Sequence, residues 1–259
     1  MNPGRVFVIA SNVFREVIRD RILYLIGVFA IVLVAAAALL PQVAANTQDK
    51  ILLDVGLAAI ALTGLVTAIF IGTGLVNKEI EKRTVFVMIA KPISRGEFIV
   101  GKHLGLTAVL AVLVTVMTVI DLVVLALNQV AAPTGSLIIA AIYTLLELSL
   151  ITAVAILFGV FTSSLLATVL TVAVYLMGQL SRDIVALGRL TENPGLQRLT
   201  EGFYLILPDL SRLNLRNQAV YGTELLPSGL ELFSHAVYGV VYIALLLAIA
   251  TLIFSRREF

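Results

Sequence analysis

The sequence predicts an all-α, polytopic membrane protein, and three observations carry that prediction. The chain has 259 residues, of which 60% are hydrophobic and only 13% are charged, and its mean hydropathy is +1.06. Soluble domains are usually about 45–50% apolar and about 25% charged. The apolar residues gather in six runs near the length of roughly 20 residues that a helix needs to cross a bilayer. This composition excludes a soluble enzyme, a nucleic-acid-binding domain and a disordered tail.

The chain begins with an expected amphipathic helix over residues 5–21. Its apolar residues recur at intervals of three and four, and they are Val6, Ile9, Ala10, Val13, Phe14, Val17 and Ile18. Polar residues, including Arg15 and Glu16, occupy the other face. This pattern is typical of an interfacial helix that lies in the membrane plane. The alternative is a plain cytoplasmic extension of the first span.

Six transmembrane helices follow along the chain. They are expected at residues 22–40, 51–76, 98–127, 136–161, 164–180 and 230–254. The first is read as a retained anchor, because its apolar core exceeds the roughly 7–15 residues of a signal peptide. Thr162, Ser163 and Ser164 favour a tight turn between the fourth and fifth spans, because short hydroxyl side chains can hydrogen-bond the backbone there.

The orientation follows from the positions of the 18 Lys and Arg residues rather than from the net charge of +2. Most of them lie before the first span, between the second and third spans, or after the sixth. Cytoplasmic segments of membrane proteins carry such an excess. We therefore expect a multi-pass protein of the cell membrane with both termini in the cytoplasm. The chain has no cysteine, which excludes disulfides and cysteine-ligated metals.

The cytoplasmic segment 77–97 is the most informative part of the chain. Charged residues come first, and a short apolar run with Phe86 and Met88 follows. Pro92 cannot continue a helix. Ser94 and Glu97 then form a Ser-x-x-Glu capping box at the start of the third span. The pattern predicts a short helix, a corner and a capped new helix. A simple connecting loop would not need an exposed apolar helix, which usually marks a partner site.

The external segment 181–229 is broken by Pro and Gly into short pieces, which we expect to be short helices forming a cap or dipping into the interface. A passive loop is the competing interpretation. Ser228 and Glu231 make a second capping box before the sixth span.

Segment 77–97 resembles the ABC-2 type permease subunits of ATP-binding cassette transporters. The resemblance rests on an acidic pair, Arg83-Thr84, an apolar helix, Lys91-Pro92-Ile93-Ser94-Arg95, Glu97-Phe98 and Gly101-Lys102. Supporting features are the N-terminal helix, the six spans, the stretch 207–212 and the ending 254–259. The resemblance implies that this segment carries the coupling helix, which docks on a nucleotide-binding subunit. The coupling candidates are then Glu79, Glu81, Thr84, Phe86, Met88, Pro92, Ser94 and Arg95.

The resemblance also implies the partners. An ABC ATPase subunit would bind ATP and Mg²⁺, and a second permease copy would complete a homodimer or heterodimer. The chain itself would hold no cofactor and would not be an enzyme. It lacks a complete phosphate loop, because His103 follows Gly101-Lys102 where the motif needs Ser or Thr.

Two acids inside the spans are candidates for a pathway or gating role. Asp121 lies in the third span and Glu147 near the middle of the fourth. A charge at mid-bilayer costs about 2.5–3.5 kcal/mol on insertion scales, so such residues face protein or water. A structural role for Glu147, hydrogen-bonded to Thr144, Ser149, Thr152 or a facing helix, is the alternative.

Small residues form two stripes within the spans, one at Gly64, Ala68 and Gly72 and one at Gly101 and Gly105. We expect both to be packing seams, because small side chains let helix backbones approach closely in lipid.

Two other functions remain open from the sequence. An ion- or proton-coupled secondary transporter would use Asp121 and Glu147, and it would be expected to show repeated, interrupted helices. An intramembrane hydrolase would use Glu79 and Glu81, but no histidine lies near them in the sequence. No catalytic or metal-ligating residues are assigned.

Overall fold

The structure, a computed structural model, describes residues 1–19, 23–43, 48–81, 94–190 and 194–256. Within these ranges the chain forms helices joined by turns and short loops, and no strand occurs there. The longer helices are α1 (Pro3–Val17), α2 (Leu23–Val43), α3 (Gln48–Glu81), α5 (Arg95–Leu127), α6 (Thr134–Phe161), α7 (Ser164–Gln179), α8 (Ser181–Leu190), α9 (Pro194–Ile206) and α11 (Gly229–Arg256). Three short elements, η2 (Leu210–Arg212), α10 (Arg216–Ala219) and η3 (Thr223–Leu225), precede α11.

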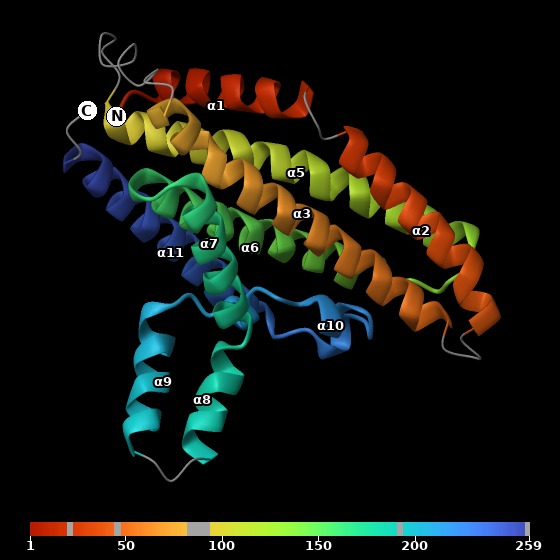
Figure 1. Cartoon of the computed structure of the whole chain (residues 1–259). Helices are drawn as coiled ribbons and strands as arrows, with labels where there is room; N and C mark the ends of the chain where they lie inside the picture. Colours follow the sequence, from red (N-terminus) through yellow and green to blue (C-terminus); the bar gives the residue numbers. More distant parts are fainter. Residues whose placement is uncertain (20–22, 44–47, 82–93, 191–193, 257–259) are drawn as a thin grey trace.

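The core is a bundle in which α6 is the central helix. Helices α3, α5 and α6 run side by side, and α11 packs on α6 and α5 (Figure 1). In the most apolar 18-residue stretch of α6, 72% is buried within the chain, whereas the corresponding stretch of α11 is 22% buried. The sequence of α6 is apolar on all sides, which suits a helix surrounded by others. In contrast, α11 lies at the edge of the bundle.

Four of the described helices are long and apolar enough to cross a membrane. They are α3 over Asp49–Asn77, α5, α6 and α11. They contain the predicted spans 51–76, 98–127, 136–161 and 230–254. Helix α2 covers the predicted first span, but its apolar part, Tyr24–Leu39, is shorter than the other four. The described helices thus supply four candidate spans, or five with the bent pair below, and the prediction of six spans is not confirmed.

The predicted fifth span is a broken helix. Helix α7 has 16 residues, which make about 24 Å of helix, and that is less than a hydrocarbon core of roughly 30 Å. At Leu180 the chain bends by 63° into α8, so the two helices form at most one bent span. Helix α7 coincides with the span predicted at 164–180, and whether it crosses a membrane stays a prediction. The tight turn before it is confirmed, because α6 ends at Phe161 and α7 begins at Ser164.

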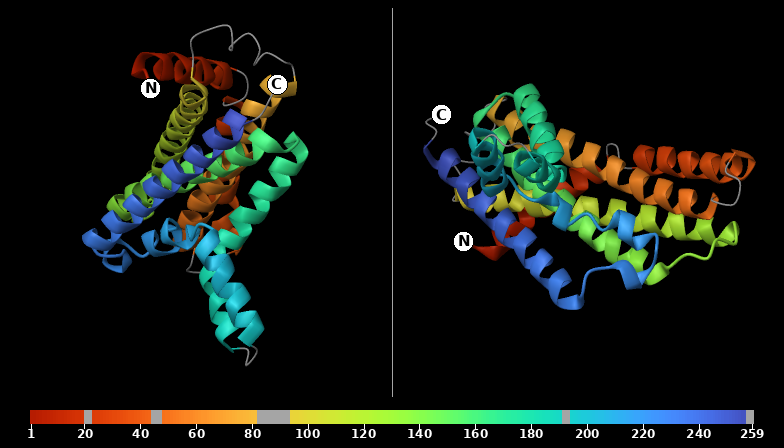
Figure 2. Two further views of the ribbon diagram at one scale, coloured as in Figure 1. Left: turned by 90° about the vertical axis from the view of Figure 1, so that its left-hand side faces the viewer. Right: turned by 90° about the horizontal axis from the view of Figure 1, so that it is seen from below.

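The described part of segment 181–229, which was predicted to be external, is largely helical, as expected. Helices α8 and α9 form a hairpin that projects away from the bundle (Figures 1 and 2). The second capping box is present, because the Ser228 backbone N–H donates to Glu231 Oε2 at 3.0 Å and the Glu231 N–H to Ser228 Oγ at 3.4 Å.

Helix α1 packs lengthwise on α5 through the glycine pair of the second stripe (Figure 1). A Cβ at Gly101 would lie 2.8 Å from Ile9 Cβ, and one at Gly105 would lie 2.7 Å from the Ala10 carbonyl oxygen. The predicted packing seam is confirmed. The buried stripe Val6, Ile9, Val13 and Val17 therefore faces α5, and whether α1 also lies in a membrane plane stays a prediction.

The first stripe is also a seam, between α3 and α6. A Cβ at Gly64 would lie 2.3 Å from Leu148 Cδ1, and one at Gly72 would lie 2.9 Å from Ala155 Cβ. Ala68, between them, is fully buried. Because these positions carry small side chains, the backbone of α3 can lie directly against the side chains of α6.

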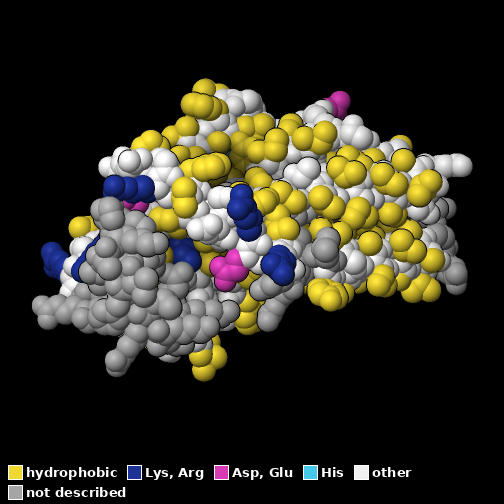
Figure 3. All heavy atoms as spheres, turned by 90° about the horizontal axis from the view of Figure 1, so that it is seen from above, with side chains coloured by type: hydrophobic (Ala, Val, Ile, Leu, Met, Phe, Trp, Pro, Cys, Tyr) yellow, Lys and Arg dark blue, Asp and Glu magenta, His cyan; other side chains and the backbone are white. Residues whose placement is uncertain are grey.

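The outer surface is apolar over much of its area. Seen from above, hydrophobic side chains cover the right-hand part of the face, and most Lys and Arg side chains lie towards the left (Figure 3). Exposed apolar residues on α11 are Leu230, Phe233, Val237, Val240, Val241, Leu245, Ile249 and Leu252. Contiguous apolar surface on this scale marks contact with a membrane or a protein partner.

Candidate functional site: the corner at the start of α5 and the polar groups at the α7–α8 break

Residues 94–97 of the predicted coupling segment form a set of hydrogen bonds at the start of α5, and we call these residues the corner. Ser94 caps the helix: the Glu97 N–H donates to Ser94 Oγ at 3.2 Å, and the Ser94 N–H donates to Glu97 Oε2 at 2.9 Å. The predicted capping box is thereby confirmed. Residues 82–93, with Thr84, Phe86, Met88 and Pro92, lie outside the described residues.

Glu79 and Glu81 lie in the last turn of α3, immediately before that segment. Their role in coupling stays a prediction.

Glu97 also ties α1 to the corner. The backbone N–H of Asn2 donates to Glu97 Oε1 at 2.6 Å, and Arg5 Nη1 lies 3.9 Å from Glu97 Oε2. The Glu97 carboxylate is only 3% exposed and is therefore shared between the first turns of two helices. A carboxylate near helix N-termini is favoured by the unpaired N–H groups and the positive end of the dipole.

Arg95 reaches a third helix from the same turn. Its Nη1 donates to the carbonyl oxygens of Phe254 and Ser255, both at 2.6 Å, in the last turn of α11. Its guanidinium carbon lies 5.9 Å from the centre of the Phe254 ring, which stacks on Phe98 at 5.6 Å. Four residues of the corner, 94–97, therefore hold the start of α5, the start of α1 and the end of α11 together.

The sequence 96–103 has phosphate-loop glycine spacing at Gly96 and Gly101, but it forms helix rather than loop. Gly101 lies against Ile9, and His103 Nε2 lies 3.0 Å from the Ser149 carbonyl oxygen. This stretch packs helices and presents no nest of free N–H groups to a phosphate.

Glu147 lies midway along α6, buried at 2% exposure, at the level where α7 ends. Gln179 Nε2, in the last residue of α7, donates to Glu147 Oε1 at 2.5 Å. Arg216 Nη2 lies 3.5 Å from both carboxylate oxygens. The expectation that Glu147 is hydrogen-bonded to a facing helix is confirmed, because Gln179 belongs to α7.

Two of the three nearby hydroxyls expected as partners of Glu147, those of Ser149 and Thr152, are engaged elsewhere. Ser149 Oγ lies 3.2 Å from Thr107 Oγ1, and Thr152 Oγ1 donates to the Leu148 carbonyl oxygen at 2.9 Å. An arginine from the segment before α11 reaches Glu147 instead, which the sequence did not indicate.

Asn214 extends this network outward from the bundle. Its Nδ2 donates to Gln179 Oε1 at 3.1 Å, and its Oδ1 accepts from Arg216 Nε at 2.8 Å. The carboxylate, the two amides and the guanidinium thus form one continuous polar group, which we call the Glu147 network. It joins the middle of α6 to the break after α7.

Asp121 has different neighbours. Its carboxylate is 2% exposed and lies against the backbone of α3, where a Cβ added at Gly56 would be 2.1 Å from Asp121 Oδ1. That oxygen has no hydrogen-bond partner in the described part of the chain. Asp121 and Glu147 are thus placed in separate surroundings rather than in one shared site.

A second polar group, which the sequence analysis did not single out as a site, is centred on Asp209. Its carboxylate accepts hydrogen bonds from Ser181, Arg182, Ser211 and Arg212 at 2.5–3.2 Å, and it is 2% exposed. We call these five residues the Asp209 cluster. The signal in the sequence was the Asp-Leu-Ser-Arg run within 207–212, noted above only as part of a resemblance.

The charge of Asp209 is stabilised by its neighbours. Burial alone would raise the pKa of Asp209, but hydrogen bonds from Ser211 and Arg212 and the positive charge of Arg182 together hold that pKa below its ordinary value. The Asp209 backbone N–H donates to the Tyr238 hydroxyl at 2.8 Å, which connects the cluster to α11.

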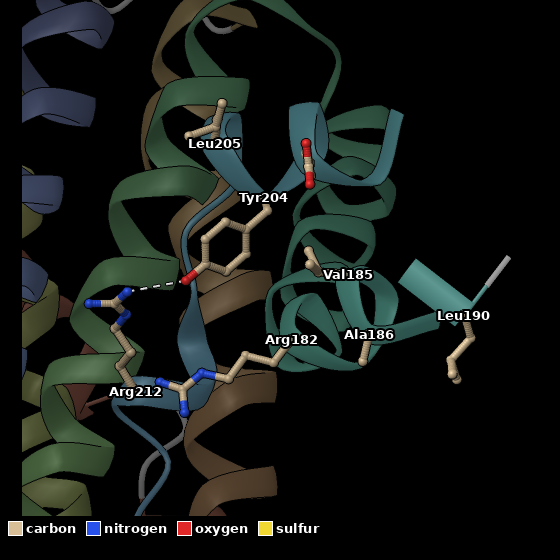
Figure 4. Close-up of a pocket in the computed structure, with 8 residues that line it drawn as sticks. Arg182, Val185, Ala186, Leu190, Tyr204, Leu205 and Arg212 are labelled. Atoms are coloured by element: carbon tan, nitrogen blue, oxygen red, sulfur yellow. Dashed lines mark hydrogen bonds between the residues drawn. The ribbon is translucent and has the colours of Figure 1, made fainter. Parts of the chain in front are cut away.

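An open cavity of about 790 Å³ lies beside the Asp209 cluster, between α8 and α9. Arg182, Arg212 and Tyr204 line one part, with Arg212 Nη2 donating to the Tyr204 hydroxyl at 3.1 Å (Figure 4). The other lining residues are Val185, Ala186, Leu190, Glu201 and Leu205. The lining is mostly apolar, with two guanidinium groups and one carboxylate. Among the described residues no three His, Asp or Glu side chains gather as a metal site.

These features define a helical membrane protein with a hydrogen-bonded corner at the start of α5 and a polar group at the break between α7 and α8. The chain matches the family described as ABC-2 family transporter protein over residues 7–259, and it belongs to that family. It is therefore a permease-type membrane transport component, and this family is not itself catalytic. No curated protein matches the chain.

Proposed function

We propose that this chain is the membrane-spanning subunit of an ATP-binding cassette exporter, driven by ATP hydrolysed on a separate ATPase subunit. The single observation that carries the proposal is the family match over nearly the whole chain. The absence of a complete phosphate loop from the sequence supports placing the ATPase on another chain. The cell membrane, with both termini in the cytoplasm, is the location that goes with this function.

We propose that the ATPase docks on segment 79–95. Its apolar run, with Phe86 and Met88, follows directly from α3 and precedes the corner that Ser94 and Glu97 fix. Movement of this segment can change the transport path only if it favours one arrangement of the helices over another. The hydrogen bonds from residues 95 and 97 to α11 and α1 supply contacts through which movement of the segment can shift these helices.

We propose a dimer of permease chains as the functional unit. The apolar face of α11 and the apolar surface of α2 are exposed in the single chain. Lipid and a second copy of this or a similar chain would share this surface. The path for the substrate would then lie between the protomers.

Co-purification tests the docking proposal. The tagged chain, solubilised from its native membrane, should bring down an ATPase that carries a phosphate loop, identified by mass spectrometry. Phe86→Asp or Met88→Asp should reduce the amount of ATPase recovered at least tenfold, because a charge would replace an apolar contact. Leu225→Asp, at an exposed site in η3, is the matched control and should leave recovery unchanged. Undiminished recovery with both aspartates would exclude this docking site.

Proton- or ion-coupled transport is the second candidate, and it rests on the buried Asp121 oxygen that lacks a partner. The Glu147 network argues for a structural role of the other acid, because its carboxylate is already paired. Transport by the purified chain without any ATPase, abolished by a protonophore, would favour this alternative.

A further inference from the structure

Helix α11 is fixed at both of its ends by side chains that belong to the two polar regions of the molecule. At the C-terminal end, the carbonyls of Phe254 and Ser255 accept from Arg95. The last carbonyls of a helix have no partner within it, and a cation there also complements the helix dipole. Arg95 therefore serves as an external cap of α11, supplied from about 160 residues earlier in the chain.

At the N-terminal half of α11, three tyrosine hydroxyls make the connections. Tyr238 accepts from the Asp209 N–H at 2.8 Å, and Tyr242 donates to the Ile206 carbonyl oxygen at 2.6 Å. Tyr143, from α6, donates to the Leu232 carbonyl oxygen at 2.5 Å. This half of α11 is thereby attached to the end of α9 and to the Asp209 cluster, beside the cavity.

Between these two ends α11 packs on α6 and α5 along one face and leaves its outer face exposed. Only 22% of its most apolar window is buried, compared with 50% in α3 and α5 and 72% in α6. A helix of 28 residues is about 42 Å long and behaves as a stiff element. The hydrogen bonds at its two ends add to this one-sided packing and fix where each end of the helix lies.

We propose that Arg95 is a positioning residue that transmits movement of the coupling segment to α11, and through α11 to the Asp209 cluster and its cavity. This inference rests on the proposed function, because it assumes an ATPase that moves segment 82–93. The geometry favours Arg95 over Ser94 and Glu97, since those two fix α5 and α1, whereas the Arg95 guanidinium donates to the last turn of α11 beside the Phe98–Phe254 stack. The outer end of α11 should therefore respond to nucleotide on the cytoplasmic side.

The absence of native cysteine allows a clean test. Leu230→Cys places one thiol at an exposed site at the outer end of α11, and Ser255→Cys places one at the inner end. Complexes are isolated through a tag on the co-purifying ATPase. The rate of maleimide modification of each thiol is then measured without nucleotide and with ATP plus vanadate.

With Arg95 intact, nucleotide should change the modification rate at both positions. In Arg95→Gln the difference at position 230 should disappear, because the shorter, neutral side chain loses both the reach and the positive charge that tie α5 to the last turn of α11. Arg95→Lys should retain part of the difference, since an ammonium group can still donate to them. Arg256→Gln, which removes a charge from an exposed site in the same turn, should behave like the unmodified background.

Three results would overturn the inference, and they are distinguishable. A wild-type nucleotide response at position 230 that survives Arg95→Gln would show that α11 does not receive its movement through Arg95. No response at position 230 in the background carrying intact Arg95, with the ATPase present, would show that α11 is static while leaving the proposed function standing. A preparation without any ATPase would overturn the proposed function and this inference together.

Discussion

At the residue scale, two buried carboxylates, Glu147 and Asp209, are held by guanidinium groups, and each pairing has a structural consequence. Glu147 pairs with Arg216 in the middle of the bundle, and Asp209 pairs with Arg182 and Arg212 near the break after α7. Burying a charge is costly unless it is paired and hydrogen-bonded. These two groups therefore fix how the segment between α9 and α11 sits on the bundle.

The Glu147–Arg216 pair predicts a non-additive pattern of stability. Glu147→Gln and Arg216→Gln should each lower the free energy of unfolding, by up to about 3–5 kcal/mol, because each leaves the other charge buried without its partner. The double variant should be less destabilised than the sum, with a coupling energy of about 1–3 kcal/mol. Thermal unfolding in detergent gives these values, with the exposed Arg198→Gln as a near-neutral control. Strict additivity would show that the two groups do not interact.

Asp209 predicts a dependence of stability on pH. A carboxyl whose folded pKa lies below its unfolded value of about 3.9 stabilises the folded state above that value, and this stabilisation is lost as the pH falls through the folded pKa. Asp209→Asn should therefore lower stability at pH 7, by about 1.5–3 kcal/mol for lost hydrogen bonds to a charged group. The difference from the unmodified chain should shrink below about pH 4. A difference that is constant from pH 7 to pH 3 would contradict the assigned charge.

At the element scale, close helix contacts depend on glycine, and the contact between α1 and α5 is the clearest case. Gly101 and Gly105 let the buried stripe of α1 rest on the α5 backbone. The sequence predicted this seam because small residues at four-residue spacing have few other uses in an apolar helix. It could not name the partner helix, because spacing within one helix carries no information about which neighbour approaches it.

Gly101→Ala and Gly27→Ala form a matched pair that tests this seam. A Cβ at Gly101 would overlap Ile9, so the change should release α1 and lower the melting temperature. A Cβ at Gly27 meets nothing within 4 Å, so alanine there should be neutral or stabilise the helix by about 0.5–1 kcal/mol. Proteolysis of the N-terminal segment and thermal unfolding measure both effects. Equal behaviour of the two variants would mean that α1 does not pack as described.

The broken helix α7–α8 shows where sequence reasoning reaches its limit. Residues 164–180 are apolar enough to read as a span, and hydropathy does not register a bend at Leu180. The bend accompanies bonds from Gln179 and Ser181 to Glu147 and Asp209, which lie far away in the chain. In contrast, the capping boxes at Ser94 and Ser228 were predictable, since each depends on residues only three apart.

At the scale of the whole molecule, the proposed orientation places segment 82–93 and both chain ends on one side of the membrane and the segment before α11 on the other. The cysteine-free chain makes this testable with single thiols at exposed sites. Tyr221→Cys should react with a membrane-impermeant maleimide in intact cells, and Phe7→Cys should react only after the membrane is opened. The reverse pattern would invert the orientation and remove the cytoplasmic assignment of the corner.

Site-specific photo-crosslinking at position 86 tests directly whether segment 79–95 docks on an ATPase. A photoreactive amino acid replaces Phe86 in the full chain, native membranes are irradiated, and adducts are identified by mass spectrometry. If an ATPase docks on this segment, we expect an adduct with an ATPase that carries a phosphate loop. We expect no such adduct when the same photoreactive group replaces the exposed Tyr221. Failure to trap an ATPase from position 86, or equal trapping from both positions, would contradict an ATP-driven permease coupled through segment 79–95.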